Sequence, residues 1–192
     1  MDLKNNVQED YMKNRKMFIL WFAAAMFVLN QNSDVFAKNF LYHATKKTIA
    51  GKIAAKGFSS KKMNPNSRFG KGVYVSDKPG TALKESRHGE TLVRGQSSKQ
   101  FQKKVLDMRK PTPERIKGIF GAQDLRGKVR NGIIGPMLGR KLGSSAGKKG
   151  QVIRYNSIKD PGSTNYFIPR RVLDKNPGII RQIRIKEGNR YR

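Results

Sequence analysis

The sequence contains no cysteine and only two histidines, His43 and His88. Without cysteine the chain has no disulfide framework, no thiolate nucleophile and no cysteine-ligated zinc site. Two histidines do not supply a histidine-rich metal centre, and the few carboxylates are not clustered as a two-metal nuclease requires. The glycine-rich stretches 70–72 and 143–149 lack the spacing of a dinucleotide or phosphate loop. The sequence therefore disfavours thiol and metal chemistry.

Acidic residues are also scarce. The chain has 13 aspartates and glutamates against 41 lysines and arginines, a formal net charge of +28 in 192 residues. Residues 1–37 hold four of each sign, so residues 38–192 hold 37 basic and nine acidic side chains. Such a charge favours an anionic partner, whether RNA, DNA, an acidic protein or an anionic lipid. Solubility or non-specific adhesion is the alternative explanation.

Long apolar runs are limited to one, at residues 17–29, and three basic residues shortly precede it. Val35-Phe36-Ala37 has small residues at the positions that a signal peptidase recognises. We therefore predict a signal peptide over residues 1–37 and a secreted or periplasmic mature protein, with Met12 a better start than Met1. The run is shorter than the roughly 20 residues that span a bilayer. An uncleaved membrane anchor is the alternative, and a buried core helix is a third.

The remaining length fits one domain, and its first part alternates strand and helix signals. A helix is indicated by apolar residues at helical spacing, and a glycine can end it. Loop residues rich in asparagine, proline and glycine separate it from a run of β-formers. The predicted elements are a strand at 39–43, a helix from Lys47 to Gly57, a strand at 73–76 and a helix from about Thr81.

Two motifs in this part resemble those of the ADP-ribosyltransferases: His43-Ala44-Thr45 and Gly72-Val73-Tyr74-Val75-Ser76. The resemblance is to the branch of diphtheria toxin and the poly(ADP-ribose) polymerases, whose motif letters are His, Tyr and Glu. It covers residues 40–85 well and residues 151–185 less well. It implies an α+β fold for residues 38–192, an ADP-ribosyltransferase-like split β-sandwich with flanking helices.

The resemblance also implies NAD as the substrate and assigns roles to the motif residues. His43 would bind the adenosine-side ribose, backbone groups at Ala44 would hold the nicotinamide carboxamide, and Tyr74 would stack on the nicotinamide. The other motif positions expected to contact NAD are Thr45, Gly72 and Ser76. Apart from the motifs, Arg68 in the preceding loop has a guanidinium suited to clamping the pyrophosphate.

The family's glutamate stands at the head of the penultimate strand, where this sequence has Asn165. Asparagine can accept a hydrogen bond from a ribose hydroxyl. It has no negative charge to stabilise the oxocarbenium character that develops as nicotinamide leaves. Ser157, Ser163 or Thr164 could contribute a hydroxyl, whereas Glu187 lies too late in the chain to replace the glutamate easily. This departure puts catalysis in question.

Residues 114–150 are rich in glycine, lysine and arginine. We expect a partly ordered basic insertion with one or two helices, the best candidate for substrate contact; a surface loop without a role is the alternative. The second half of the domain is predicted to hold strands at 151–155, 165–168 and 179–185.

Together these features predict an exported mono-ADP-ribosyltransferase-like toxin or effector. It would be an NAD-dependent glycosyltransferase and a monomer, transferring ADP-ribose to a protein or nucleic-acid acceptor. An immunity or inhibitor protein would be a further partner. The alternative is a non-catalytic, strongly basic protein on the same fold that binds nucleic acid or an anionic surface.

Overall fold

The structure, a computed structural model, describes residues 40–59, 63–86, 89–120, 129–130 and 133–187. The predicted signal peptide lies outside the described residues, as does His88. None of the helices within these ranges is long and apolar enough to cross a membrane.

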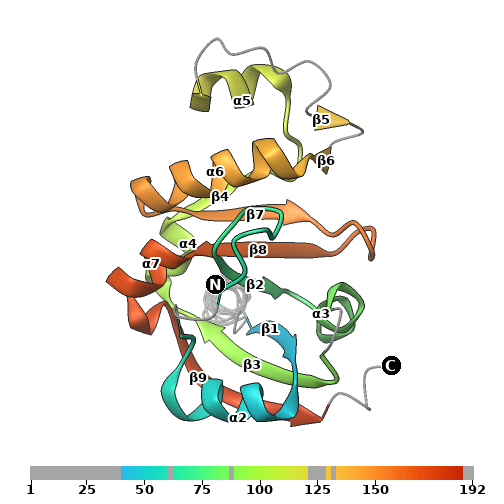
Figure 1. The fold of residues 1–192 in the computed structure, drawn as a ribbon, viewed down its shortest axis with the longest axis vertical. Coiled ribbons are helices and arrows are strands. Elements are labelled where there is room, and N and C mark those ends of the chain that lie inside the picture. Colours follow the sequence, from blue (N-terminus) through green and yellow to red (C-terminus); the bar gives the residue numbers. More distant parts are fainter. Residues whose placement is uncertain (1–39, 60–62, 87–88, 121–128, 131–132, 188–192) are drawn as a thin grey trace, which may run out of the picture. The chain divides into compact units, whose positions relative to one another are not determined.

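A seven-stranded sheet runs through the described part of the chain, in the order β4-β7-β8-β2-β1-β3-β9 (Figure 1). β4 and β7 are parallel, and all other neighbours are antiparallel. The strands are β1 (Phe40–Thr45), β2 (Gly72–Ser76), β3 (Thr91–Ser97), β4 (Val105–Asp107), β7 (Val152–Asn156), β8 (Thr164–Pro169) and β9 (Ile180–Glu187). A separate pair is formed by β5 (Val129–Arg130) and β6 (Ile133–Ile134).

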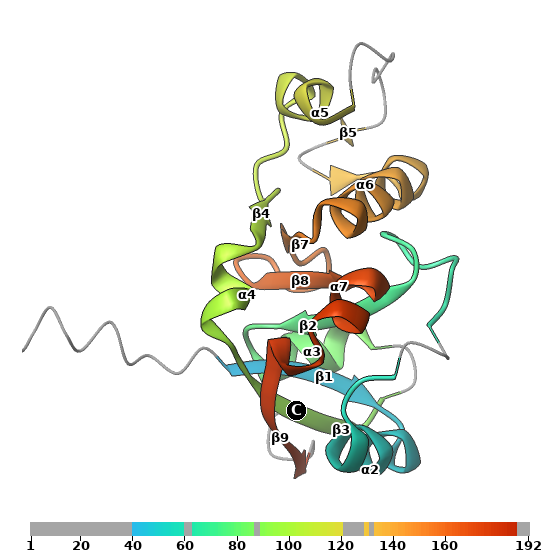
Figure 2. The same cartoon turned by 90° about the vertical axis from the view of Figure 1, so that its left-hand side faces the viewer.

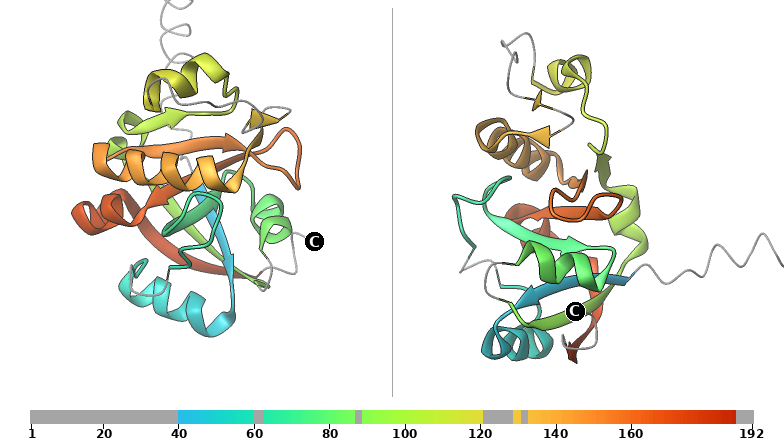
Figure 3. Two further views of the ribbon diagram at one scale, coloured as in Figure 1. Left: turned by 45° about the horizontal axis from the view of Figure 1, so that its top comes forward. Right: turned by 90° about the vertical axis from the view of Figure 1, so that its right-hand side faces the viewer.

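Helices pack against strands near both edges of the sheet and against its middle strands. This mixture of helices with a largely antiparallel sheet confirms the predicted α+β class. α2 lies against β3 and β9, α3 against β1 and β2, and α6 against β7 and β8; Figures 2 and 3 show α2 and α6 beside these strands. The helices are α2 (Lys47–Lys56), α3 (Pro79–Glu85), α4 (Lys99–Lys103), α5 (Pro113–Phe120), α6 (Pro136–Lys149) and α7 (Arg170–Lys175), with a 3₁₀ turn, η3 (Pro177–Ile179).

The predicted strands and helices of the first half are present. α2 ends where expected, because Gly57 adopts a positive φ of 76° that a side chain would disfavour. α3 begins two residues before Thr81, since Pro79 is preorganised for the first helical turn. Alternation along β2 sends Val73 and Val75 to one core cluster and Tyr74 to another.

Strand β3 is not predicted by the sequence pattern, because basic and polar residues surround it. Leu92 and Val93 are adjacent, and both are buried, so the strand lacks the apolar–polar alternation of a half-exposed strand. It pairs with β1 on one side and with β9 on the other. These non-local partners, rather than local propensity, account for the strand.

One or two helices were expected within the basic insertion, and residues 136–149 form the longest described helix, α6. Leu138, Leu142 and Ala146 bury one face of α6 in the core. A Cβ on Gly143 would lie 1.9 Å from the carbonyl oxygen of Phe69, so only glycine permits this close approach. The glycines of α6 therefore let the helix pack directly on a neighbouring backbone.

The sheet is least continuous between β1 and β2. These strands share a single register pair, Tyr42 with Ser76, whereas β1 and β3 pair along six positions. Backbone hydrogen bonding therefore divides the sheet into β4-β7-β8-β2 and β1-β3-β9, and the strands separate on either side of this one pair.

Candidate functional site

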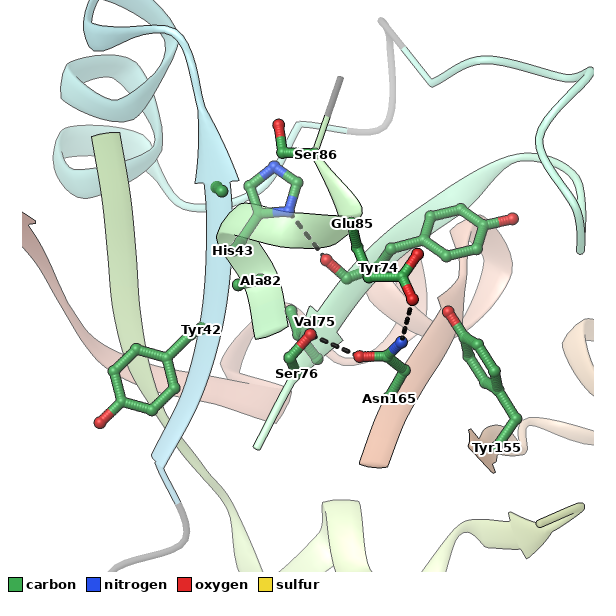
Figure 4. A pocket seen from close by; sticks show the side chains of 11 residues that line it. Tyr42, His43, Tyr74, Val75, Ser76, Ala82, Glu85, Ser86, Tyr155 and Asn165 are labelled. Carbon is green, nitrogen blue, oxygen red and sulfur yellow. Dashed lines mark hydrogen bonds between the residues drawn. The ribbon is translucent and has the colours of Figure 1, made fainter. Parts of the chain in front are cut away.

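A cavity of about 140 Å³ lies where β1 and β2 separate (Figure 4). Strands β1, β2, β7 and β8 and helix α3 supply its walls. The lining residues are Tyr42, His43, Ala44, Tyr74, Val75, Ser76, Ala82, Glu85, Ser86, Tyr155 and Asn165. A cavity of roughly 150 Å³ is known to hold one benzene ring, so this one has about the size of a single six-membered ring.

One transverse row of the sheet crosses the cavity. Tyr155 is paired with Asn165, Asn165 with Ser76, and Ser76 with Tyr42. Directly opposed residues of antiparallel neighbours project to the same side, and the register brings the side chains of Ser76, Asn165 and Tyr155 together, whereas the Tyr42 ring points away from them (Figure 4). The site is thus built on strands rather than on loops, which fixes its geometry.

A short hydrogen-bonded chain connects three of the lining residues. The Ser76 hydroxyl donates to Asn165 Oδ1 at 2.5 Å, and Asn165 Nδ2 donates to Glu85 Oε1 at 3.3 Å. Ser76 and Asn165 are buried. A carboxylate, that of the last residue of α3, therefore lies beside Asn165 at the head of β8 (Figure 4).

The loop between β7 and β8 holds this carboxylate. Glu85 Oε1 accepts hydrogen bonds from the Ser157 hydroxyl at 2.6 Å and from the backbone N–H groups of Ile158 and Lys159 at 3.2 and 3.4 Å. A carboxylate at a helix C-terminus is disfavoured by the helix dipole, and these donors offset that penalty. Oε2 receives no hydrogen bond from any described residue and remains available to a ligand.

Asp160 ties the same loop to α3. It accepts hydrogen bonds from the hydroxyl of Thr81 and from Lys84, the latter at 2.7 Å. Together with Ser163, these donors hold the pKa of Asp160 well below its usual range, with Lys84 the largest cause. The loop and helix that position Glu85 are thus fastened to each other next to the cavity.

His43 is oriented by the backbone of β2. Its Nδ1 lies 2.8 Å from the carbonyl oxygen of Tyr74, and a carbonyl oxygen only accepts, so Nδ1 carries the proton. Burial lowers the pKa of His43, which favours the neutral ring at pH 7. Nε2 then has a free lone pair and can accept a hydrogen bond from a hydroxyl. Phe58 packs edge-on against the imidazole, with ring centroids 5.5 Å apart.

Tyr74 lines the cavity with a ring that is fixed from behind. Phe167 and Phe69 lie at centroid distances of 4.9 and 6.4 Å. The Tyr74 hydroxyl accepts from the Phe69 N–H at 2.8 Å, and burial raises its pKa to about 12. The phenol is therefore neutral and already hydrogen-bonded, so the ring face is the part that it can offer to a ligand.

Tyr155 lines the cavity, and Arg68 packs against its ring. Burial raises the pKa of Tyr155, and its hydroxyl forms no hydrogen bond with a described residue. The Arg68 guanidinium stacks 5.3 Å from the Tyr155 ring centroid, and its Nε donates to the Ile134 carbonyl at 3.0 Å. Arg68 is thus held one ring away from the cavity, and its terminal nitrogens form no hydrogen bond with a described residue.

Of the residues predicted from the sequence, the structure brings five to the cavity: His43, Ala44, Tyr74, Ser76 and Asn165. Four others do not line it. Ser157 donates a hydrogen bond to Glu85, which lines the cavity, and Arg68 stacks on the ring of Tyr155, which also lines it. Thr45 pairs with Thr91 at the end of β1, and Gly72 lies against Phe167, where a Cβ would come within 2.3 Å of the ring.

The other six lining residues were not predicted, among them Glu85 and Tyr155. Glu85 is one of only nine carboxylates beyond residue 37. Because acidic residues are this scarce, each of them was a candidate for a functional role. Tyr155 could not be assigned without the register of β7. Among the described residues no three metal-ligating side chains come together. No protein-family model matches the chain, and no curated protein matches it either.

Proposed function

We propose that this protein is an exported mono-ADP-ribosyltransferase-like toxin or effector that transfers ADP-ribose from NAD to a macromolecule. The observation that carries the proposal is the convergence of His43, Tyr74 and Asn165 on one cavity, with the Glu85 carboxylate beside Asn165. The single register pair between β1 and β2 supports the split β-sandwich that such a fold implies.

The cavity fits one part of the substrate, the nicotinamide ring. Its volume of about 140 Å³ takes a single ring, and the fixed face of Tyr74 supplies an aromatic surface for stacking. The phosphates of NAD would extend outside, where Arg68 presents a guanidinium. Nε2 of His43 would accept a hydrogen bond from a ribose hydroxyl.

Glu85 supplies the negative charge that Asn165 lacks. Departure of nicotinamide from the anomeric carbon builds oxocarbenium character on the ribose, and a fixed carboxylate nearby stabilises that charge without reorganisation. Asn165 and the β7–β8 loop orient Glu85 through Oε1, which leaves Oε2 for the ribose. Asn165 and Glu85 would thus together perform the role that a single glutamate has in the family.

The transfer balances without any other reactant. The bond between the anomeric carbon and the pyridinium nitrogen breaks, and its electron pair stays with nicotinamide, which leaves neutral. A nucleophilic oxygen or nitrogen of the acceptor bonds to the same carbon and loses a proton to solvent. No metal, oxidant or reductant enters these steps.

Export has consequences for the partners. NAD is scarce outside cells, so an exported transferase would act inside another cell. The producing cell would then need an immunity or inhibitor protein for any of the enzyme that stayed within it. We expect the chain to act as a monomer.

The test measures nicotinamide release from NAD by the full chain, with cell extract as a source of acceptors. Wild type should turn over NAD, and Asn165→Ala should lose about tenfold or more, because Asn165 orients the charged group. Asn156→Ala is the matched control, since that side chain is exposed and donates to the Arg109 carbonyl away from the cavity.

Equal turnover by wild type and Asn165→Ala would refute the site. No release by wild type with protein or nucleic-acid acceptors would refute the transferase and favour the alternative, a non-catalytic basic binding protein. Intact-mass analysis of RNA, DNA and proteins after incubation would identify the modified acceptor.

A further inference from the structure

A dense group of cations covers the outer face of α6 and the adjoining α7. We call it the basic face and define it by its exposed members. They are Lys71, Arg140, Lys141, Lys148, Lys149, Arg170, Arg171 and Lys175. The only carboxylate within these two helices is Asp174, which pairs with Arg170 at 3.4 Å.

These residues are neighbours in space as well as in sequence. A Cβ on Gly147 of α6 would lie 3.8 Å from the Cβ of Arg171 in α7. The backbone N–H of Arg170 donates to the carbonyl of Lys71 at 3.0 Å, which places the loop before β2 against the start of α7. The basic face is therefore one continuous surface made of two helices and a loop.

Most of its charges have no carboxylate partner among the described residues. Within the described ranges, Arg140, Lys148, Lys149 and Arg171 form no ion pair with a carboxylate. Like charges packed this closely repel one another and attract a counterion atmosphere. A partner that replaces those counterions gains free energy from their release.

The spacing and chemistry of the face favour a nucleic-acid backbone over an acidic protein. α6 has 14 residues and is about 21 Å long, a length that spans about six phosphates of one strand at roughly 3.4 Å each. Such a run of negative charges complements a face that carries cations and almost no carboxylate. A protein surface would offer mixed charges and apolar area, yet Met137 is the only large apolar residue exposed here.

The residue types of the basic face also favour a nucleic-acid duplex over a single strand. Proteins that hold single strands stack bases on exposed aromatic side chains, and no tyrosine, phenylalanine or tryptophan occurs in α6 or α7. We propose that the basic face binds the phosphate backbone of a duplex nucleic acid without reading its bases. The binding needs no transferase activity. Only the step from bound partner to ADP-ribose acceptor rests on the proposed function.

The test measures binding of a labelled DNA duplex of about two helical turns to the full chain, without NAD, over a series of salt concentrations. The variant neutralises four cations of the basic face: Arg140→Gln, Lys148→Gln, Lys149→Gln and Arg171→Gln. Its matched control loses the same four charges from exposed sites at and within α2, which packs on β3 and β9: Lys46→Gln, Lys47→Gln, Lys52→Gln and Lys56→Gln.

Each phosphate contact contributes about 0.9 to the slope of log affinity against log salt. We expect the basic-face variant to lose about three units of slope and at least about tenfold in affinity at low salt, and the α2 variant to lose less than about one unit. Equal losses in the two variants would overturn the proposal, because they would show that only net charge matters. Displacement of the duplex by poly-glutamate at equal charge would also overturn it and indicate an acidic protein partner.

Binding is independent of turnover, so the two failures are distinguishable. A basic-face variant that releases nicotinamide at the wild-type rate but no longer binds the duplex would support the proposed duplex-binding surface. It would not test whether the duplex is the ADP-ribose acceptor. Circular dichroism melting of both quadruple variants confirms that each is folded before its affinity is compared.

Discussion

Around the cavity most polar side chains are held by hydrogen bonds, whereas on the basic face they extend into solvent. Glu85 Oε1 alone receives four hydrogen bonds, while Lys148 and Arg171 are exposed and form no ion pair with a described carboxylate. Fixed groups suit a small ligand whose reacting atoms must be held to a fraction of an ångström. Long, free cations suit a polyanion recognised through its charge.

Helix α6 belongs to both regions. Its inner face packs on the Arg68–Phe69 backbone, which holds the Tyr74 hydroxyl, and its outer face carries the cations. The two regions can therefore be perturbed separately by changing side chains, or together by changing how α6 packs. The following predictions use that difference, from the largest expected effect to the smallest.

Glu85→Gln is expected to change the function of the cavity most strongly while leaving that of the basic face unchanged. It removes the negative charge but keeps an amide oxygen for the loop donors, so nicotinamide release should fall by about 10²–10³-fold while the fold is retained. Duplex binding should not weaken. Glu114→Gln is the control, because Glu114 is exposed in α5. Turnover by Glu85→Gln within twofold of wild type would remove Glu85 from the site.

Both regions should fail together in Gly143→Ala. The new Cβ would meet the Phe69 carbonyl oxygen at 1.9 Å, so we expect the free energy of unfolding to fall by about 1–3 kcal/mol. Gly51→Ala in α2 is the matched control, since its Cβ meets nothing within 4 Å and the change should stabilise the helix by up to ~1 kcal/mol. Urea unfolding measures both. An equal gain in stability by the two variants would contradict the close packing of α6.

The cavity should also give the protein a dependence of stability on pH that the basic face does not. Burial lowers the pKa of His43 in the folded state, so the unfolded chain takes up that proton first as the pH falls. The free energy of unfolding should therefore drop as the pH falls below about 6.5, the ordinary value for histidine. His43→Gln should flatten this part of the curve.

The experiment compares urea unfolding midpoints of wild type and His43→Gln between about pH 5 and pH 7.5, around the ordinary histidine value. The contribution of Asp160 lies in a separate window. Its pKa is lowered in the folded state, so its stabilisation is present at neutral pH and is lost progressively as the pH falls below the ordinary aspartate value near 4. Parallel curves for the two proteins above pH 5 would show that His43 does not titrate as its burial requires.

The smallest effect is expected from Tyr155→Phe. The change removes one neutral hydroxyl that faces the cavity, so the KM for NAD should rise by about two- to tenfold with little change in kcat. Tyr166→Phe is the control, because Tyr166 packs against Phe101 in the other core cluster, with ring centroids 5.3 Å apart. A larger effect of the control on KM would place the substrate outside this cavity.

Much of the first half of the domain could be predicted from the sequence. The strand of His43, the helix that ends at Gly57 and the strand of Tyr74 each depend on local signals: apolar spacing, a glycine with positive φ and a run of β-formers. Strand β3 could not be predicted in the same way, because it is stabilised by partners on either side. A helix was expected within residues 114–150, but its packing on the Phe69 backbone could not be predicted, because that contact joins residues far apart in the sequence.

The sequence alone determined the charge of the protein, the absence of thiol chemistry and the two motif strands, because these depend on composition and on neighbours along the chain. Only the tertiary structure decided where the carboxylate lies. Glu85 and Asn165 are 80 residues apart, and they meet because the strand register sends Asn165 and Ser76 to the same face. A slip of one residue in that register would reverse every side chain along the strand, and no local pattern encodes which of the two registers forms.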